Sequence, residues 1–188
     1  SHSCAVLSEG FVKCWGSGGF GQLGNNQTDN SQIPVFVSGV INAKAISAGI
    51  HHSCALINDG SLKCWGNNYF GQLGNNSTTN QSTPVTVIGI NSAIAVSAGN
   101  GHTCALLSGG TIKCWGKGDN GQLGSELRGD HLTPVSVSGI NNATAITSGE
   151  YHSCSLLNNG SIKCWGSGGN GRLGNGSTVE QETPVSVS

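Results

Sequence analysis

The chain has 188 residues, of which only 9% are charged and 31 are glycine. Eight lysines and arginines against nine aspartates and glutamates give a net charge of −1 with no basic block, which argues against binding driven by nucleic-acid phosphates. No apolar run approaches the roughly 20 residues that a membrane-spanning helix needs, so we expect no membrane span.

A segment of the form His-x-Cys-x5-Gly-x3-Cys-Trp-Gly recurs at intervals of 50 residues. A fixed period of this length indicates a repeat architecture. We treat residues 1–188 as a single repeat domain. The repeats are approximately 1–50, 51–100, 101–150 and 151–188, and the last of them is incomplete.

Each repeat begins with a predicted β-hairpin. In the first repeat, residues 2–7 and 11–16 are half-apolar runs joined by a three-residue loop that ends in Gly10, a residue that tolerates positive φ. This register places Cys4 directly opposite Cys14, at a separation that a disulfide accepts. We therefore predict four disulfides, which join Cys4 to Cys14, Cys54 to Cys64, Cys104 to Cys114 and Cys154 to Cys164.

Two further strands are predicted in each repeat. An alternating run over 34–37 starts with Pro34, and residues 43–49 form the fourth strand of the unit. No helical period persists anywhere, so the fold class is all-β and each unit is a four-stranded antiparallel meander. Small residues such as Ala5 and Ala48 suit sheets covered on both faces by neighbouring sheets. Radial stacking of such blades makes a β-propeller.

The recurring residues Cys-Ala-Leu-x3-Gly-x2-Lys-Cys-Trp-Gly, Gly-Gln-Leu-Gly and Pro-Val-x-Val-x-Gly-Ile resemble the regulator of chromosome condensation 1 (RCC1) family, including its secreted bacterial members. The resemblance implies blades of about 50 residues, typically seven in a closed propeller. About four blades are present here, so we expect an incomplete propeller unless other copies or further sequence complete it. The founding member is a guanine-nucleotide exchange factor that docks on nucleosomes, but its loop wedge and basic elements have no counterpart in this sequence.

The repeated motif could also be a metal-binding, catalytic or dinucleotide-binding site, and we compare these interpretations with a structural one. His2, Cys4 and Cys14 would share one face and supply three zinc ligands, but no fourth ligand is evident. Thiol catalysis by the same residues is disfavoured, because an active site is normally one place on a scaffold. Glycines in the repeats also match a dinucleotide-binding fingerprint, but that fingerprint must be followed by a helix and none is predicted here. We therefore expect no catalytic, cofactor-binding or metal residues, and no cofactor.

The tryptophan after each second cysteine has two interpretations. It could stack against sugars or bases, or it could pack between blades. Identical placement in every repeat favours packing. The four residues are Trp15, Trp65, Trp115 and Trp165.

Loop residues that depart from the repeat pattern are better candidates for specific contacts. The candidate interaction residues are His51, Tyr69, Phe70, Arg128, Asp130 and His131. Seven sequons are candidate glycosylation sites, at Asn26, Asn75, Asn76, Asn80, Asn142, Asn159 and Asn175.

Eight cysteines in regular pairs indicate an oxidising compartment, so we expect an extracellular or cell-surface location. The leading hypothesis is a non-enzymatic protein-interaction or self-assembling structural module. Its partner would be a protein, including other copies of itself, rather than a small molecule or nucleic acid. The final repeat stops before its fourth strand, so the two ends differ and favour a head-to-tail ring or filament.

Two alternatives belong to other classes. One is a regulatory binding module, either a guanine-nucleotide exchange factor or a secreted enzyme inhibitor of the RCC1-like propeller type. The other is a lectin-like binder, which would need aromatic residues clustered on one face of the propeller.

Overall fold

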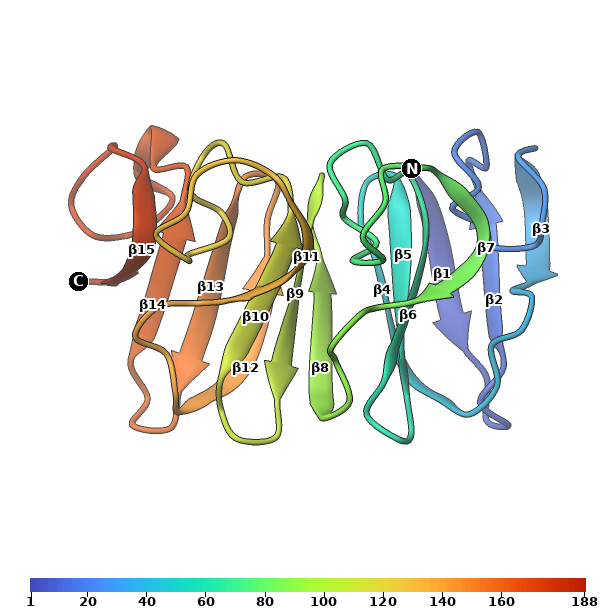
Figure 1. Cartoon of the computed structure of the whole chain (residues 1–188), viewed down its shortest axis with the longest axis horizontal. Coiled ribbons are helices and arrows are strands. Elements are labelled where there is room, and N and C mark those ends of the chain that lie inside the picture. The colour runs from blue at the N-terminus through green and yellow to red at the C-terminus, as the bar shows by residue number, and fades with distance from the viewer.

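A computed structural model describes all 188 residues, Ser1–Ser188, as fifteen strands and one short 3-10 helix, Gly169–Gly171 (Figure 1). The strands are β1 His2–Val6, β2 Val12–Gly16, β3 Ser31–Phe36, β4 Ala43–Ala48, β5 His52–Ile57, β6 Leu62–Gly66, β7 Gln81–Thr86, β8 Ala93–Ala98, β9 His102–Leu107, β10 Ile112–Gly116, β11 His131–Ser136, β12 Ala143–Ser148, β13 His152–Leu157, β14 Ile162–Gly166 and β15 Gln181–Ser186. No helix is long and apolar enough to cross a membrane.

The strands form four antiparallel sheets that stand side by side as the blades of an open, incomplete propeller (Figure 1). The first sheet has three strands in the order β1-β2-β3. The other three have four strands each, β4 to β7, β8 to β11 and β12 to β15. The strands β4, β8 and β12 lie innermost, and β4 packs beside β8 as β8 packs beside β12. The all-β prediction and the four-stranded meander are confirmed.

The assignment of the fourth strand to a sheet was wrong. We expected residues 43–49 to complete the first unit, but β4 is the inner strand of the next sheet, where Ile46 faces Ala55 and Ser47 faces Cys54. The cause is the short connection of residues 49–51, which folds β4 back onto β5 as a tight hairpin. Each blade therefore ends after its outer strand, 14 residues before the boundary of the sequence repeat, as between Phe36 and residue 50.

The predicted hairpins and their register are present in every repeat. Cys4 pairs with Cys14 across β1 and β2, with Cα atoms 4.1 Å apart. Gly10 closes the turn at a φ of +76°, and its N–H donates to the carbonyl of Leu7. All eight cysteines form disulfides in the predicted pairs.

The hydrophobic cores lie between successive blades rather than within one. Trp115 extends from the third sheet into a core with Leu56 and Leu62 of the second. Gly74 makes room for this ring, because a Cβ there would lie 2.7 Å from the indole nitrogen. Its φ of +68° also favours glycine. Each blade thus offers one face that receives a tryptophan and an opposite face that carries one.

Candidate interaction surfaces

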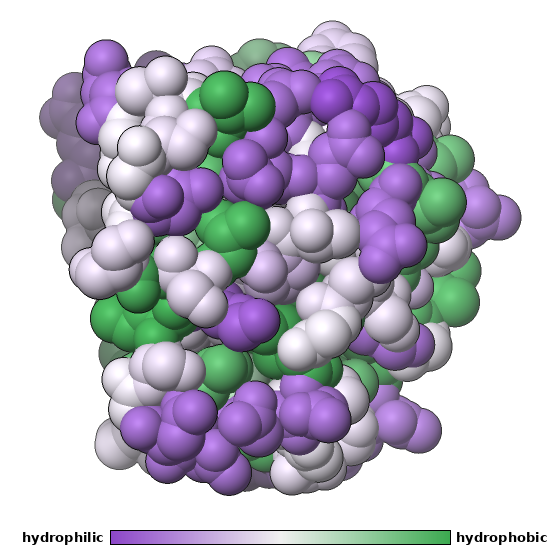
Figure 2. Space-filling view, turned by 90° about the vertical axis from the view of Figure 1, so that its left-hand side faces the viewer, coloured by the Kyte–Doolittle hydropathy of each residue, from purple (hydrophilic) through white to green (hydrophobic).

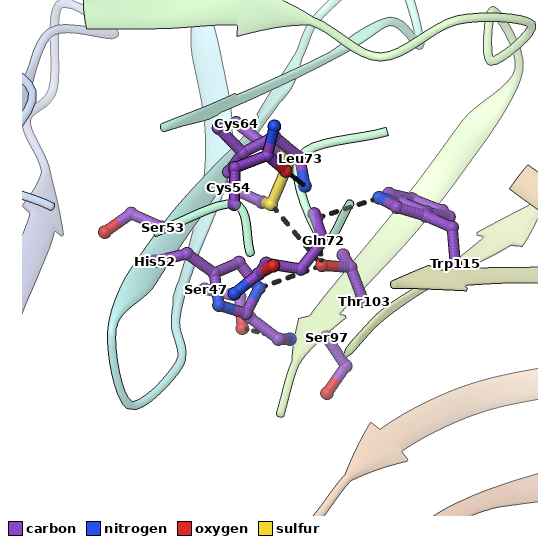
Figure 3. The surroundings of a disulfide bond; sticks show 12 residues. Ser47, His52, Ser53, Cys54, Cys64, Gln72, Leu73, Ser97, Thr103 and Trp115 are labelled. Carbon is purple, nitrogen blue, oxygen red and sulfur yellow. Dashed lines mark hydrogen bonds between the residues drawn. A yellow bond between two sulfur atoms is a disulfide. The ribbon is translucent and has the colours of Figure 1, made fainter. Parts of the chain in front are cut away.

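A hydrogen-bonded chain joins each pair of neighbouring blades (Figure 3). Between the second and third blades, the Thr103 hydroxyl donates to the carbonyl of Gln72 at 2.8 Å, and the Trp115 indole N–H donates to the same oxygen at 2.9 Å. Thr103 Oγ1 also lies 2.9 Å from Nε2 of His52. Because the hydroxyl proton is already given to Gln72, His52 must be the donor here and carry its proton on Nε2.

The buried His52 and His102 are neutral structural groups. Burial lowers the pKa of His52 to about 3 and that of His102 to about 4, because the charged imidazolium would lose its hydration. Their Nδ1 atoms are buried without a hydrogen-bond partner. Cys54 and Cys64 beside them are joined in a disulfide, so neither thiol is free to bind zinc or act as a nucleophile. The zinc and thiol interpretations therefore do not fit the sites.

The tryptophans pack between blades, as predicted. Trp65, Trp115 and Trp165 have no exposed surface, which leaves them no face for a sugar or a base. Trp15 differs, because it lies in the first described blade and is only half-buried.

The last blade exposes a face that is covered at every internal junction. We call it the socket face, and its residues are Leu156, Ile162, Leu173, Gly174 and Val187. Leu156 is 40% exposed, whereas Leu56 and Leu106 at the equivalent positions are 1% exposed. Figure 2 views this end of the molecule and shows apolar side chains across its middle, between more polar rims.

The socket face is hollowed as well as apolar. A cavity of about 430 Å³ lies against it, and Ile146 and the disulfide-bonded Cys154 and Cys164 add to its lining. Gly174 occupies the position at which Gly24, Gly74 and Gly124 contact the tryptophan of the following blade. Here only Val187 is near it. The hollow therefore has the shape and position of an empty tryptophan site.

The first blade exposes the matching face. We call it the knob face, and it consists of Ser3, Ala5 and Trp15. Ser3 is exposed, whereas Ser53 at the equivalent position is fully buried and donates to the carbonyl of Gln22. The two ends of the molecule thus carry the two halves of its own internal junction.

Three of the six predicted contact residues lie at one end of the blades: His51, Tyr69 and Phe70. We call this end, the upper rim in Figure 1, the loop face; it carries the connections 17–30, 67–80 and 117–130. The ring of Phe20 lies 4.9 Å from that of His51 and 6.4 Å from that of Tyr69.

A second aromatic group lies on the same face. Nζ of Lys117 lies 4.8 Å from the ring of Phe70 and 5.9 Å from that of Tyr151. Gly101 occupies the position that His51 has one repeat earlier, and its lack of a side chain leaves room for the Phe70 ring. The sequence reasoning missed Phe20, Lys117 and Tyr151.

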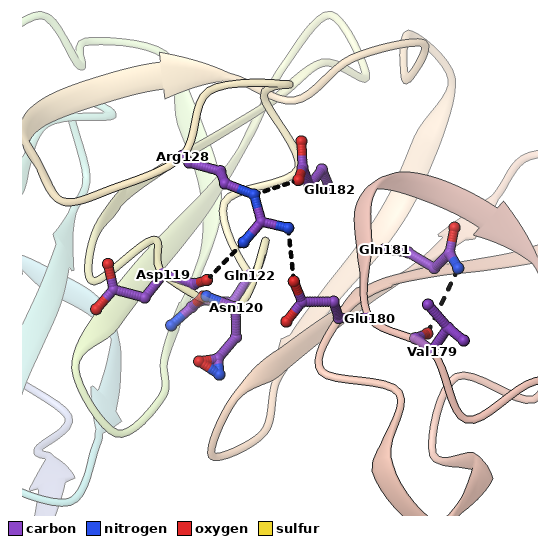
Figure 4. Close-up of polar contacts among 8 residues, drawn as sticks. All are labelled: Asp119, Asn120, Gln122, Arg128, Val179, Glu180, Gln181 and Glu182. Carbon is purple, nitrogen blue, oxygen red and sulfur yellow. Dashed lines mark hydrogen bonds and ion pairs between the residues drawn. The ribbon is translucent and has the colours of Figure 1, made fainter.

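The other three predicted contact residues have contacts within the chain. Arg128 forms ion pairs with Glu180 and Glu182 of the next repeat (Figure 4). Asp130 accepts a hydrogen bond from the Gly118 N–H at 3.2 Å, as Asn30 and Asn80 do in their own loops. His131 begins β11 and pairs with Gly116. Arg128 and Asp130 thus have partners within the chain, and a role of the three residues in contacts with another protein stays a prediction.

Comparison with known proteins settles the family. The model of the regulator of chromosome condensation (RCC1) repeat matches residues 9–56, 59–106 and 110–156, well over half of the chain. This chain belongs to the RCC1 repeat family. A second RCC1 repeat model matches residues 43–72, 93–122 and 143–172, which begin at the inner strands.

Several solved structures share the fold of this chain. Yeast RCC1 (Prp20) bound to Kap60 superposes with a TM-score of 0.89 at 24% identity, over 100% of this chain and 46% of the yeast chain. A structure of Prp20p from Saccharomyces cerevisiae, described with its binding properties to Gsp1p and histones, superposes with a TM-score of 0.85 at 24% identity. The match covers 100% of this chain and 48% of the Prp20p chain. Human WBSCR16 superposes with a TM-score of 0.69 at 19% identity, over 100% of this chain and 65% of the human chain. This chain thus spans about half the length of the yeast proteins.

Alignment of the RCC1 repeats with one another identifies a surface that the sequence reasoning missed. Four positions of the first repeat are large and apolar where the later repeats have serine, threonine or asparagine, and all four are exposed: Phe11 43%, Ile33 70%, Phe36 56% and Ile41 59%. The rings of Phe11 and Phe36 are 6.2 Å apart, and Nζ of Lys13 lies 4.3 Å from the Phe36 ring. We call these four residues the outer patch.

The sequons lie in turns and loops of the RCC1 repeats. Asn26 and Asn76 adopt positive φ, and Asn159 accepts hydrogen bonds from Ser161 within a hairpin turn. Asn142 donates to Asn158. Glycosylation at Asn26, Asn75, Asn76, Asn80, Asn142, Asn159 and Asn175 stays a prediction.

Proposed function

We propose that this RCC1 repeat protein is a non-enzymatic, extracellular protein-interaction module whose copies associate head to tail. The observation that carries the proposal is the pair of end faces. Residues of the socket face and the knob face are buried against each other at three internal junctions and are uncovered at the two ends. The occupant that fits the socket of one copy is therefore the knob of the next.

The internal junctions indicate what drives this contact. Leu62 and Ile112 are fully buried by the following blade, whereas Ile162 at the equivalent position is 43% exposed. Complete burial of a side chain of this kind stabilises by about 1.5–3 kcal/mol. The socket face exposes three such side chains, Leu156, Ile162 and Val187, beside a site for Trp15. Covering this face therefore removes a substantial apolar surface from water.

The geometry of the contact determines the kind of assembly. The two faces differ, so the contact is heterologous and leaves a free face at each end of every open complex. Such contacts close a ring if the rotation between copies permits it and otherwise continue as a filament.

The extracellular assignment rests on the disulfides. Four pairs join every cysteine of the chain, and such bonds persist in oxidising environments rather than in the cytosol. The relationship to yeast RCC1, a protein solved in complex with Kap60, supports protein binding at the level of the fold and does not extend to its particular partners.

The direct test places a charge on the socket face. Leu156→Arg is tolerated by the isolated blade because the side chain is 40% exposed. We expect sedimentation velocity to show concentration-dependent assembly of the wild-type chain at micromolar concentrations and a monomer for L156R.

The matched control is Ile88→Arg. Ile88 is 49% exposed, and the other repeats have Ser38 and Ser138 at its position, so an arginine there adds the same charge away from both ends. This variant should assemble like the wild type. A wild-type chain that stays monomeric over the whole range would contradict head-to-tail association.

A further inference from the structure

Every phenylalanine and tyrosine of the chain lies outside the cores between the blades. Phe11 and Phe36 belong to the outer patch, and the remaining four rings lie on the loop face: Phe20, Tyr69, Phe70 and Tyr151. Tyr69 is 65% exposed, and the other three rings of the loop face are half-buried. Core packing does not require these rings, and aromatic rings gathered at a surface are typical of a binding site.

The four rings form one row across the junctions of successive blades. The ring of Phe20 in the first blade lies 6.4 Å from that of Tyr69 in the second. Nζ of Lys117 in the third blade lies 4.8 Å from the ring of Phe70 and 5.9 Å from that of Tyr151 in the fourth. Because Tyr69 and Phe70 are successive residues, the two groups adjoin and the row is continuous.

The loops hold these rings in fixed positions. The backbone N–H groups of Phe20 and Phe70 each donate to the side-chain oxygen of the glutamine two residues later, at 2.9 and 3.0 Å. Asn120 makes the same bond in the third repeat, so the loop conformation does not depend on an aromatic residue at this position. A ring on such a loop loses little conformational entropy when a ligand stacks on it.

The row is an open surface with few charges around it. Its rings line neither of the two hollows of the molecule, so it offers no pocket for an anchoring side chain of a protein partner. The connection 67–80 has no charged residue, and the connection 17–30 has only Asp29. At the other end of the row, Lys117 and Glu150 carry opposite charges. A ligand that is held by its net charge therefore finds no complementary field here.

Hydrogen-bonding groups lie beside the last ring of the row. The side-chain amide of Asn100 donates to the hydroxyl of Tyr151 at 3.5 Å. That hydroxyl is also hydrogen-bonded to the carboxylate of Glu150, which raises the pKa of Tyr151. An amide and a carboxylate bind hydroxyl groups well, and hydrogen bonds to a charged acceptor are the stronger kind.

We propose that the loop face binds a neutral oligosaccharide, whose sugar rings stack on Phe20, Tyr69 and Phe70. Its hydroxyl groups are bound by Asn100 and Glu150 at the end of the row. A pyranose has C–H groups on one face and hydroxyl groups around its edge, so it matches an aromatic surface, whose ring faces are negative, with polar groups beside it. The site is separate from the socket face and the knob face, so it adds a second kind of ligand to the proposed function.

The experiment measures the binding of uncharged hexasaccharides to the full-length L156R chain, in which head-to-tail association cannot contribute. The probes are α- and β-linked hexasaccharides of glucose, mannose, galactose and N-acetylglucosamine, and the method is isothermal titration calorimetry. We expect saturable binding of at least one probe with a Kd below about 1 mM. The affinity should be the same at about 50 and about 500 mM NaCl, because salt does not screen contacts with an uncharged ligand. No binding of any probe, or binding that is lost at high salt, would overturn the proposal.

Substitutions taken from the chain's own repeats locate the site. In the double variant Phe20→Asn and Tyr69→Asp, each new residue is the one that the third repeat has at that position, Asn120 or Asp119, so the loops keep their conformation. This variant should bind at least about tenfold more weakly than L156R. The control is Phe36→Ser, which removes an exposed ring of the outer patch where the other repeats have serine or threonine, and it should bind like L156R. Equal affinity of the double variant and L156R would show that the rings of the loop face do not bind the sugar.

Discussion

Tryptophan and glycine form one unit at each blade junction. The ring of Trp115 fills the space that Gly74 leaves empty, and its indole N–H satisfies the carbonyl of Gln72, which the Thr103 hydroxyl also contacts. Close packing and hydrogen bonding act together here, because loss of the ring would leave a cavity and remove one of the two donors to the Gln72 carbonyl. The motif that the sequence presents as Cys-Trp-Gly is thus a connector between blades.

A matched pair of substitutions tests this role. Trp115→Ala should lower the free energy of unfolding by about 3–5 kcal/mol, the usual cost of removing a buried aromatic side chain. Trp15→Ala should cost clearly less, because Trp15 is half-buried and its knob face is uncovered. Urea denaturation of the L156R background, in which assembly does not contribute, measures both values. Equal losses would contradict the assignment of Trp15 to an open face.

The buried histidines make stability depend on pH. In the folded chain burial lowers the pKa of His52 to about 3 and that of His102 to about 4, below the usual value of about 6.5 in an unfolded chain. The unfolded state therefore binds more protons below pH 6.5. Stability is fully present above that pH and falls as the pH drops towards 4, by about 1.4 kcal/mol per pH unit for each of these histidines.

His52→Gln separates this effect from other titrations. Glutamine keeps an N–H near Thr103 but does not titrate, so the slope of unfolding free energy against pH between 6 and 4.5 should decrease by about 1.4 kcal/mol per unit. Urea denaturation across this range gives the slope for both chains. An unchanged slope would show that His52 takes up its proton without unfolding.

At the scale of the strand, local patterns predict local structure and little beyond it. The hairpin loop ending in Gly10 determines a register, so the Cys4–Cys14 pairing could be derived without any other part of the chain. The run over 43–49 was predicted as a strand, but the pattern does not say which neighbour it pairs with. That choice depends on the connection to β5, and it decides whether the missing strand lies at the first blade or the last.

The disulfide of each hairpin should stabilise the blade that carries it. Replacing Cys104 and Cys114 together by alanine frees a loop of about ten residues and should cost about 3 kcal/mol by the chain-entropy estimate. Thermal and urea unfolding measure the loss. In the unaltered chain, a thiol reagent under native conditions should find no reactive cysteine, because all eight are paired. Eight reactive thiols would remove the support for an extracellular protein.

At the scale of the whole molecule, function depends on relations between repeats that no single repeat contains. Arg128 was predicted as a contact residue because it departs from the pattern, but its charge meets Glu180 and Glu182 across the blade junction. The outer patch was detectable from the sequence by aligning the repeats, because Phe36 stands where the others have serine or threonine. The end faces were not, because only the packed blades show that Leu156 and Ser3 belong to opposite halves of one junction.

Mixing two blocked variants tests head-to-tail association most directly. Ser3→Arg blocks the knob face and leaves the socket intact, whereas Leu156→Arg blocks the socket and leaves the knob intact. Each variant alone should sediment as a monomer, and an equimolar mixture should form a one-to-one dimer that grows no further, since both remaining faces are blocked. A mixture that stays monomeric while the wild type assembles would contradict the socket-to-knob contact.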